Sequence, residues 1–252
     1  MKKFPQTLLL TICIGVFCFS AWKLFGIWQE YHTGDEIYDS IQKEVSIRKD
    51  ESISSEPSSH ENPENDFLVD LSSLKEINPD TIGWIRIPGT SIDYPILQTG
   101  SNEDYLRTTI TGETNKAGCI FADYRSEQPF YCANTIVYGH NLLNGKMFSD
   151  LMNYEDSSWY QVHPQVFIQT SDRVQIYEIY SCYRTAADSR TYTFGLKTST
   201  EAYADYLENT IKQALYSTGI KPADTEQILT LSTCTNESET ERFVVHARLL
   251  SR

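Results

Sequence analysis

Short runs of β-forming residues, separated by turn signals, fill the chain from Thr81 to Leu250, and this pattern limits the choice of fold more than any other feature. The predicted strands occupy residues 81–98 (with turn signals at Pro88-Gly89 and Tyr94-Pro95), 118–123, 134–139, 166–170, 173–183, 227–233 and 242–250. Two stretches between strands, residues 142–154 and 199–219, have helical patterns. Many short strands with few crossover helices predict a largely antiparallel, barrel-like β domain with helical insertions.

The helix predicted over residues 199–219 has the clearest helical period. Its apolar face consists of Tyr203, Tyr206, Leu207, Ile211, Ala214 and Leu215, and Gly219 is a candidate stop. A further helical pattern begins near Phe67, where we expect the folded domain to start. The sequence therefore predicts one domain over residues 67–252.

The N-terminus has the pattern of a membrane anchor. Lys2 and Lys3 precede a run without charge from Thr7 to Trp22, and the apolar character continues to Trp28. At 1.5 Å per residue, the span 7–28 reaches roughly 30 Å, the thickness of a bilayer core. The lysines should stay in the cytoplasm with residues 1–6, which predicts a single-pass protein whose bulk lies outside the cell.

A cleaved signal peptide, with a cleavage point near Ser20, is the competing interpretation. An uncleaved anchor is favoured because the apolar run is long, has Trp22 and Trp28 near its outer end, and lacks an A-x-A site. Between anchor and domain, residues 29–66 are predicted to form a helical and flexible extracellular stalk. Ile37, Ile41 and Val45 have the spacing of a short amphipathic helix, and residues 52–65 are rich in Ser, Glu, Asn and Pro.

Charge and cysteine content exclude two classes of function. The net charge is -13, with no cluster of Lys and Arg, which argues against a general nucleic-acid binder. Of six cysteines, Cys13 and Cys18 lie in the apolar run, and the other four form no C-x-x-C pair, so no metal site or cofactor is expected. Cys119 with Cys132 is left open as a disulfide pair.

The last two predicted strands suggest a reactive cysteine. In residues 227–234 the alternation of side chains places Ser232 and Cys234 on one face, and Arg242 begins the next strand after a polar loop. If the strands pair as a hairpin, the thiol and the guanidinium meet at the mouth of the loop. A nearby cation favours the thiolate and can stabilise a developing oxyanion. Free cysteines are also often simply packed, so the pattern alone leaves nucleophile and core residue evenly balanced.

A cysteine nucleophile needs a histidine, and the sequence favours one that is distant along the chain. His246 lies four residues along the strand from Arg242, roughly 13 Å from the reactive end. His32 and His60 lie in the stalk, and His163 precedes a proline in a turn-like stretch. His140 ends a strand at the predicted rim of the barrel, where catalytic groups tend to lie.

TLSTC ending at Cys234, Arg242 at the start of the next strand and YGHN around His140 together resemble the sortase signature. The phrases NPDTIGWIRIPGTSIDYPILQ and YGHNLLNGKMFSDL, and the helix before the strand that ends in Cys234, are similar to class B sortases. The resemblance covers residues 68–250. It implies a mostly β fold with helical insertions: a closed eight-stranded barrel, N-terminal helices, and a helix inserted before the strand of the catalytic cysteine.

The resemblance also implies an activity, that of a cysteine transpeptidase which anchors surface proteins to the peptidoglycan of a Gram-positive bacterium. Cys234 would attack the Thr carbonyl of an N-P-x-T-x-like sorting signal, His140 would transfer protons, and Arg242 would stabilise the oxyanion. The acceptor would be an amine of the cell wall. By similarity, the substrate groove would be lined by Ser232, Asn102, Tyr105 and Leu106.

Two alternatives remain open at this point. A membrane-anchored cysteine peptidase would use the same thioacyl step and release its product to water, but the papain-like C-G-S-C-W pattern is missing and the histidine precedes the cysteine. A non-catalytic wall-binding module would use Cys234 only for packing.

Overall fold

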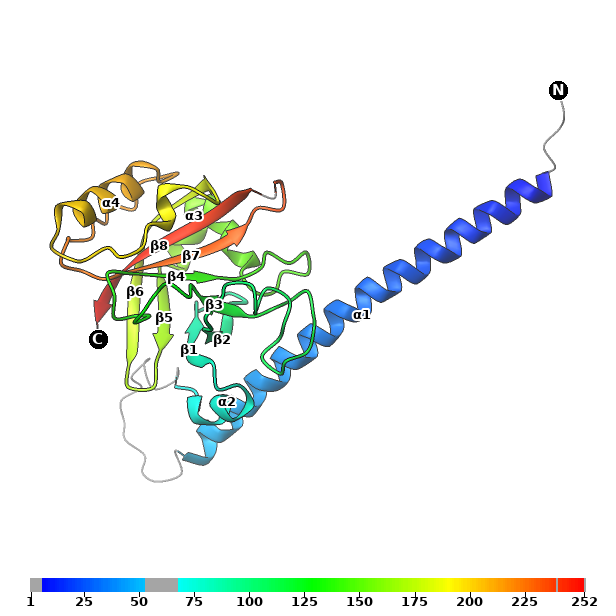
Figure 1. Cartoon of the computed structure of the whole chain (residues 1–252), viewed down its shortest axis with the longest axis horizontal. Helices are drawn as coiled ribbons and strands as arrows, with labels where there is room; N and C mark the ends of the chain where they lie inside the picture. Colours follow the sequence, from blue (N-terminus) through cyan, green and yellow to red (C-terminus); the bar gives the residue numbers. More distant parts are fainter. Residues whose placement is uncertain (1–5, 53–67, 239, 252) are drawn as a thin grey trace.

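A closed barrel of eight strands forms the body of the molecule, in the order β1-β2-β3-β4-β7-β8-β6-β5 (Figure 1). The computed structural model describes residues 6–52, 68–238 and 240–251. The strands are β1 (Thr81–Arg86), β2 (Asp93–Leu97), β3 (Ile120–Ala122), β4 (Asn134–Tyr138), β5 (Gln165–Gln169), β6 (Val174–Ala186), β7 (Ile228–Cys234) and β8 (Glu241–Ser251). The predicted eight-stranded barrel is confirmed.

The barrel is mixed, since β2 pairs with β3 and β4 pairs with β7 in parallel while the other neighbours are antiparallel. The parallel pairing of β4 with β7 has a direct consequence for function. Parallel neighbours end at the same edge of a sheet, so the segments that follow Tyr138 and Cys234 emerge side by side.

Buried side chains fill the barrel, among them Ile85, Ile96, Val137, Ile168 and Leu231, each 0% exposed. Outside the barrel, α4 (Glu201–Lys212) crosses between β6 and β7 and is capped by Thr200, whose hydroxyl accepts from the Tyr203 amide. Tyr203, Tyr206 and Leu207 of α4 pack against Tyr180 of β6 and Ile228 of β7. The outer face of β7 is buried as well, although it carries the polar residues Thr230 and Ser232.

The predicted helix over 199–219 is confirmed only in its first half. After Lys212 the chain pairs with β6 instead, since the Leu215 amide donates to the Cys182 carbonyl at 2.9 Å and Leu215 is 51% exposed. Gly219, with φ of +79°, lies in a separate turn.

The predicted helix over 142–154 is wrong in its first half. Residues 142–146 form a turn closed by a bridge between Asn141 and Met147, and Gly145 and Met147 have positive φ, which a right-handed helix does not allow. Helical structure begins only at the 3-10 helix η2 (Ser149–Glu155) and continues in α3 (Ser157–Val162). Shorter helices are α2 (Leu71–Ile77), which is capped by Asp70, and η3 (Arg190–Tyr192).

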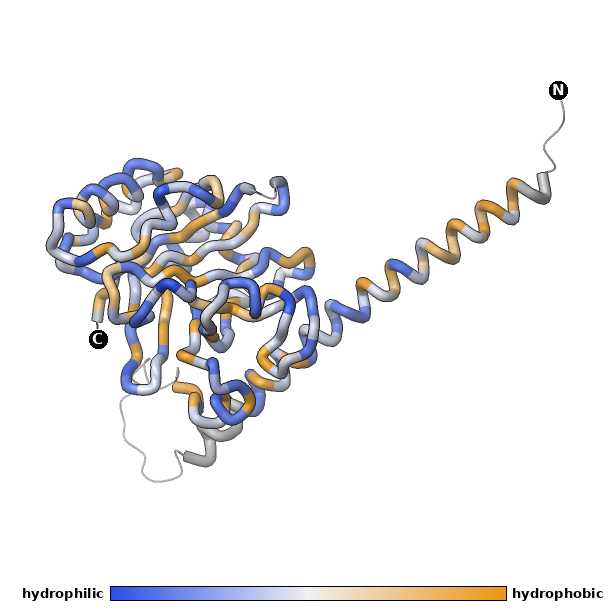
Figure 2. Tube along the Cα trace, in the orientation of Figure 1, coloured by the Kyte–Doolittle hydropathy of each residue, from blue (hydrophilic) through white to orange (hydrophobic). Residues whose placement is uncertain are grey.

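The N-terminal helix α1 (Gln6–Ser52) is continuous, where a shorter amphipathic helix was predicted after the anchor. Its first half projects away from the barrel with large apolar side chains exposed from Leu9 to Trp28, and it is long and apolar enough to cross a membrane (Figures 1 and 2). Its second half lies on the barrel, where Tyr38 and Ile41 are each 4% exposed. The flexible segment predicted over 52–65 lies, except for Ser52, outside the described residues.

Polar contacts hold the second half of α1 in place. Glu30 forms an ion pair with Lys116 at 2.8 Å, Asp39 one with Lys146 at 3.4 Å, and the Tyr38 hydroxyl donates to the Gly118 carbonyl. α1 is therefore bound to both loops that flank β3 and β4, which are the loops nearest to the site described next.

Candidate active site

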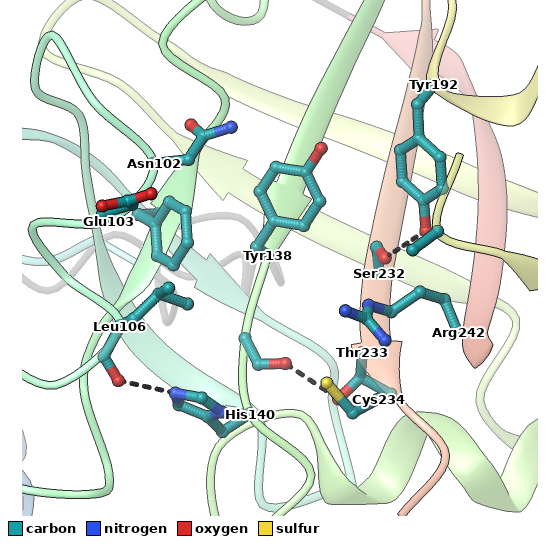
Figure 3. Close-up of a pocket in the computed structure, with 13 residues that line it drawn as sticks. Asn102, Glu103, Leu106, Tyr138, His140, Tyr192, Ser232, Thr233, Cys234 and Arg242 are labelled. Atoms are coloured by element: carbon teal, nitrogen blue, oxygen red, sulfur yellow. Dashed lines mark hydrogen bonds between the residues drawn. The ribbon is translucent and has the colours of Figure 1, made fainter. Parts of the chain in front are cut away.

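Cys234 and Arg242 face each other across the hairpin of β7 and β8. Their Cα atoms are direct partners in the antiparallel register, so their side chains lie on the same side of the sheet. In Figure 3 the Arg242 guanidinium and the Cys234 thiol extend into the same space. The Arg242 Nη1 also donates to the Glu241 carbonyl at 2.9 Å. The predicted juxtaposition of thiol and guanidinium is present in the structure.

His140 reaches the same corner through the parallel pairing of β4 and β7. Tyr138 is the register partner of Ser232, and two residues further along each chain stand His140 and Cys234. Two hydrogen bonds extend this pairing past the strand ends. The Gly139 amide donates to the Ser232 carbonyl at 3.2 Å, and the Asn141 side chain donates to the Cys234 carbonyl at 3.0 Å. The structure thus brings together residues separated by almost a hundred positions.

One hydrogen bond fixes the tautomer of His140. Its Nε2 lies 2.7 Å from the Leu106 carbonyl oxygen, which can only accept, so Nε2 carries the hydrogen. In the neutral ring, Nδ1 is then the atom that can take up a proton. The hydrogen bond also restrains the ring on the side of the 102–106 segment (Figure 3).

A cavity of about 240 Å³ opens between these side chains (Figure 3). Its lining residues are Asn102, Glu103, Leu106, Phe121, Tyr138, Gly139, His140, Ala187, Tyr192, Ser232, Thr233, Cys234 and Arg242. Three of the four residues predicted to bind substrate, Ser232, Asn102 and Leu106, line this cavity.

Tyr105 is the exception among the predicted substrate-binding residues. It does not line this cavity, is 7% exposed, and its hydroxyl donates to Asp80 at 2.7 Å. The neighbouring Leu106 lines the cavity, in a turn whose Leu106 amide donates to the Glu103 carbonyl at 3.2 Å. Tyr105 packs in the core beneath the segment that carries Leu106.

Two tyrosines that the sequence did not indicate complete the wall. Tyr138 and Tyr192 stack with ring centroids 6.2 Å apart, and the Tyr192 hydroxyl lies 2.8 Å from Ser232 Oγ. Tyr138 shares a strand face with His140, so the period of the strand contained that signal. Tyr192 lies in the short helix η3 before α4 and has no local signal.

The other described cysteines of the barrel are not placed for chemistry of this kind. Cys119 and Cys182 are buried, and burial raises the pKa of their thiols to about 12 and about 11. Cys119 and Cys132 are both free thiols, so the disulfide left open between them is absent. Their Sγ atoms donate instead to the carbonyls of Thr108 at 3.1 Å and Asn134 at 3.2 Å.

The other histidines of the barrel have structural partners. His246 is fully buried and lies between Thr230 and the Tyr183 hydroxyl, as its distance from the reactive end suggested. A ring nitrogen of His163 lies 2.8 Å from the Pro88 carbonyl. Within residues 6–52, 68–238 and 240–251, no group of three or more His, Cys, Asp or Glu side chains is arranged to hold a metal ion.

Comparison with known proteins identifies the family of this site. Residues 85–250 match the model of the sortase domain. The chain is 32% identical to Sortase B of Listeria monocytogenes over 100% of its own length and 99% of the relative, and 31% identical to Sortase B of Staphylococcus aureus over 71% and 74%.

Superposition on solved structures leads to the same family. The S. aureus sortase B-substrate complex superposes with a TM-score of 0.72 at 29% identity, covering 88% of this chain and 99% of that one. Sortase B from B. anthracis in complex with AAEK1 gives a TM-score of 0.71 at 30% identity, covering 90% and 100%. The chain therefore belongs to the sortase family, in its class B, and is a cysteine-type transpeptidase that acts on sorting signals.

Proposed function

We propose that this enzyme cleaves an N-P-x-T-x-like sorting signal after the Thr, holds the substrate as a thioacyl adduct on Cys234, and transfers it to an amine of the peptidoglycan. The observation that supports the proposal is that His140, Cys234 and Arg242 line one cavity at one edge of the barrel. Parallel pairing of β4 with β7 brings the strand ends before His140 and Cys234 side by side, and antiparallel pairing of β7 with β8 places Arg242 opposite Cys234.

In the first half-reaction, Sγ of Cys234 bonds to the Thr carbonyl carbon and the peptide bond to the following residue breaks. Negative charge develops on the carbonyl oxygen, and the guanidinium of Arg242 can donate two parallel hydrogen bonds to it. The departing amine needs a proton. We assign its transfer to Nδ1 of His140, which takes the proton of the Cys234 thiol as Sγ attacks and passes it to the amine, because Nε2 is engaged by Leu106.

In the second half-reaction the acceptor amine attacks the thioester carbonyl. Nδ1 of His140 takes the proton from the amine and passes it to Sγ as the thioester bond breaks, which regenerates the Cys234 thiol. A peptide occupant of the cavity is supported by two solved relatives, the sortase B-substrate complex of S. aureus and a sortase B complexed with triglycine. The partners proposed here are surface proteins that bear the signal and a cross-bridge or precursor amine of the wall.

We also propose that residues 7–28 anchor the enzyme in the cell membrane as a single span, with residues 1–6 in the cytoplasm and the catalytic domain, residues 67–252, outside. The unbroken run of α1 from its apolar half to its docked half supports an anchor over a cleaved signal peptide. Removal of residues 1–20 would cut within this single helix. The intact mass of the mature protein distinguishes an uncleaved anchor from a cleaved signal peptide.

Full-length enzyme in detergent micelles, incubated with sorting-signal peptides and candidate amines, tests the proposal. We expect a new amide product with at least one amine, and loss of all turnover in Cys234→Ala and His140→Ala. Hydrolysis alone, across glycine peptides and wall-precursor amines, would refute transpeptidation. Turnover retained in Cys234→Ala would refute the thioacyl mechanism itself.

A further inference from the structure

The carboxylate of Asp123 stands behind the cavity and binds five donors. Asp123 directly follows β3 and is 0% exposed. Its Oδ1 accepts from the amide and Nε of Arg125, both at 2.9 Å, and its Oδ2 accepts from Nη2 of Arg125 at 2.7 Å. The Oδ2 also accepts from Nδ2 of Asn102 at 2.8 Å and from the Tyr138 hydroxyl at 2.9 Å. A carboxylate is stable at such depth only when paired and fully hydrogen-bonded.

Two of these donors belong to the cavity wall. Asn102 and Tyr138 both line the cavity, one from the loop after β2 and one from β4. The Asn102 side chain is fixed at both ends, because its Oδ1 accepts from the Tyr124 amide at 2.9 Å. Asp123 therefore joins two wall residues that come from separate segments of the chain.

The third donor connects Asp123 to the opposite wall. The Arg125 guanidinium lies over the Phe194 ring, 3.7 Å from its centroid, and Phe194 is in the irregular segment that carries Tyr192. Tyr192 stacks on Tyr138 and contacts Ser232. The contacts thus form a closed ring, from Asp123 through Tyr138 to Tyr192 and back through Phe194 and Arg125.

The ring of contacts lies at the end of the cavity away from the reacting groups. Tyr138 and Ser232 precede His140 and Cys234 by two residues in their strands, which corresponds to roughly 7 Å. Figure 3 shows Asn102, Tyr138 and Tyr192 together, apart from His140 and Cys234. A peptide whose scissile carbonyl lies at Cys234 and which extends along the cavity would contact this end with the residues on one side of the scissile bond.

Electrostatics favours a fixed, charged Asp123. Burial alone would raise the pKa of this carboxyl, and the donors from Arg125, Asn102 and Tyr138 outweigh burial, so its pKa is lowered. Burial and then the Asp123 charge raise the pKa of the Tyr138 phenol, which therefore stays protonated and remains a donor. At neutral pH the donors therefore keep Asp123 ionised, and the charge of Asp123 keeps the Tyr138 hydroxyl protonated.

We propose that Asp123 is a positioning residue that shapes the subsite for the sorting-signal residues preceding the scissile bond. It acts on substrate recognition through Asn102, Tyr138 and the segment around Tyr192, and touches neither substrate nor reacting atoms. This inference rests on the proposed function, since it assigns the far end of the same cavity to the same peptide.

Asp123→Asn is the direct test, in full-length enzyme in detergent micelles. The substitution keeps the shape but removes the charge and replaces one acceptor oxygen with a donor. We expect KM for the peptide to rise roughly tenfold, the effect of losing a charge-assisted hydrogen bond, with kcat changed by less than about threefold. Discrimination among peptides altered before the Thr should weaken in parallel.

Asp93→Asn is the matched control. Asp93 of β2 also binds an arginine and a ring donor, since its Oδ1 accepts from Nε of Arg86 at 2.8 Å and from Nε1 of Trp84 at 2.6 Å, but neither of these two donors lines the cavity. KM should be unchanged in this variant. If Asp123→Asn does not fold, Phe194→Leu breaks the contact with Arg125 at the outer side of the ring and should raise KM severalfold.

Hydrogen exchange supplies a readout that does not depend on turnover. In Asp123→Asn, exchange should rise together in residues 99–106 and 190–197, and in Asp93→Asn in neither. An unchanged KM together with unchanged hydrogen exchange in Asp123→Asn would overturn the inference. A fall in kcat at constant KM would also overturn it, because it would place Asp123 in the chemical step. If wild-type enzyme turns over none of the sorting signals, the proposed function fails, whereas an effect missing only in the variant refutes the role of Asp123.

Discussion

We expect His246 to lower the stability of this enzyme as the pH falls, beginning at a pH higher than that at which carboxylates take up protons. The imidazole is 0% exposed, and its two nitrogens lie 2.9 Å from Thr230 Oγ1 and 3.0 Å from the Tyr183 hydroxyl. Burial lowers its pKa to about 3, because no carboxylate compensates for the loss of water around the charged ring. The folded protein therefore holds a neutral His246 at neutral pH.

The size of the effect follows from linkage. In the unfolded chain the pKa is near 6.5, so between pH about 6.5 and 3 the unfolded state binds a proton that the folded state does not. The free energy of unfolding must fall as the pH falls through this window. For these two values His246 contributes a loss of about 2 kcal/mol between pH 7 and pH 5.

Urea unfolding of wild type and His246→Gln at pH 7, 6 and 5 measures this contribution. Gln can bond to the same two hydroxyls but does not titrate, so carboxylate contributions cancel in the comparison. The variant should be the less stable protein at pH 7, and the gap should narrow by about 2 kcal/mol at pH 5. Parallel stability curves from pH 7 to 5 would refute the neutral, buried state of His246.

Three further predictions concern single side chains. Arg242→Lys should lower kcat/KM roughly 100-fold without shifting the unfolding midpoint, because a point charge cannot reproduce the guanidinium fork; unchanged kinetics would contradict its role. Tyr38→Phe should cost about 1 kcal/mol in chemical unfolding, since it removes the hydrogen bonds of the α1 hydroxyl to the Gly118 carbonyl and to Cys119 Sγ; no loss would show that α1 is not docked there. Arg184→Gln should cost less than about 1 kcal/mol and nothing in 1 M NaCl, because Arg184 pairs with exposed carboxylates such as Glu237 at 2.8 Å; a loss that persists in salt would refute a screened ion pair.

The sequence predicted most of the fold because strand signals are local. Alternation and turn residues mark each strand, and the order of TLSTC, Arg242 and His140 led to the family, whose closed barrel the structure confirms. The helix predicted over 142–154 was wrong in its first half because apolar spacing does not reveal positive φ at Gly145 and Met147. Backbone geometry of that kind depends on tertiary contacts, such as the bond from the Met147 amide to the Tyr94 hydroxyl.

The candidate site was predictable to the extent that it lies on strands. Arg242 followed from hairpin geometry, and His140 from elimination and from its place at a strand end, but the parallel pairing of β4 with β7 that brings His140 near Cys234 has no sequence signal. Tyr192, in the short helix η3, and Asp123, at the end of a predicted strand, were missed because no motif marks either of them. Tyr105 was grouped with Asn102 and Leu106 because a matching motif transfers its residues together, whereas in this structure Tyr105 lies in the core.

The most direct test of the account is to trap the covalent intermediate. Full-length enzyme mixed rapidly with a sorting-signal peptide, in the absence of added amine, is quenched in acid and its intact mass is measured. We expect the mass of the enzyme to increase by that of the peptide up to its Thr. Digestion should map this adduct to Cys234, and it should be absent in Cys234→Ala. Product formation without any adduct on Cys234, or an adduct on another residue, would contradict it.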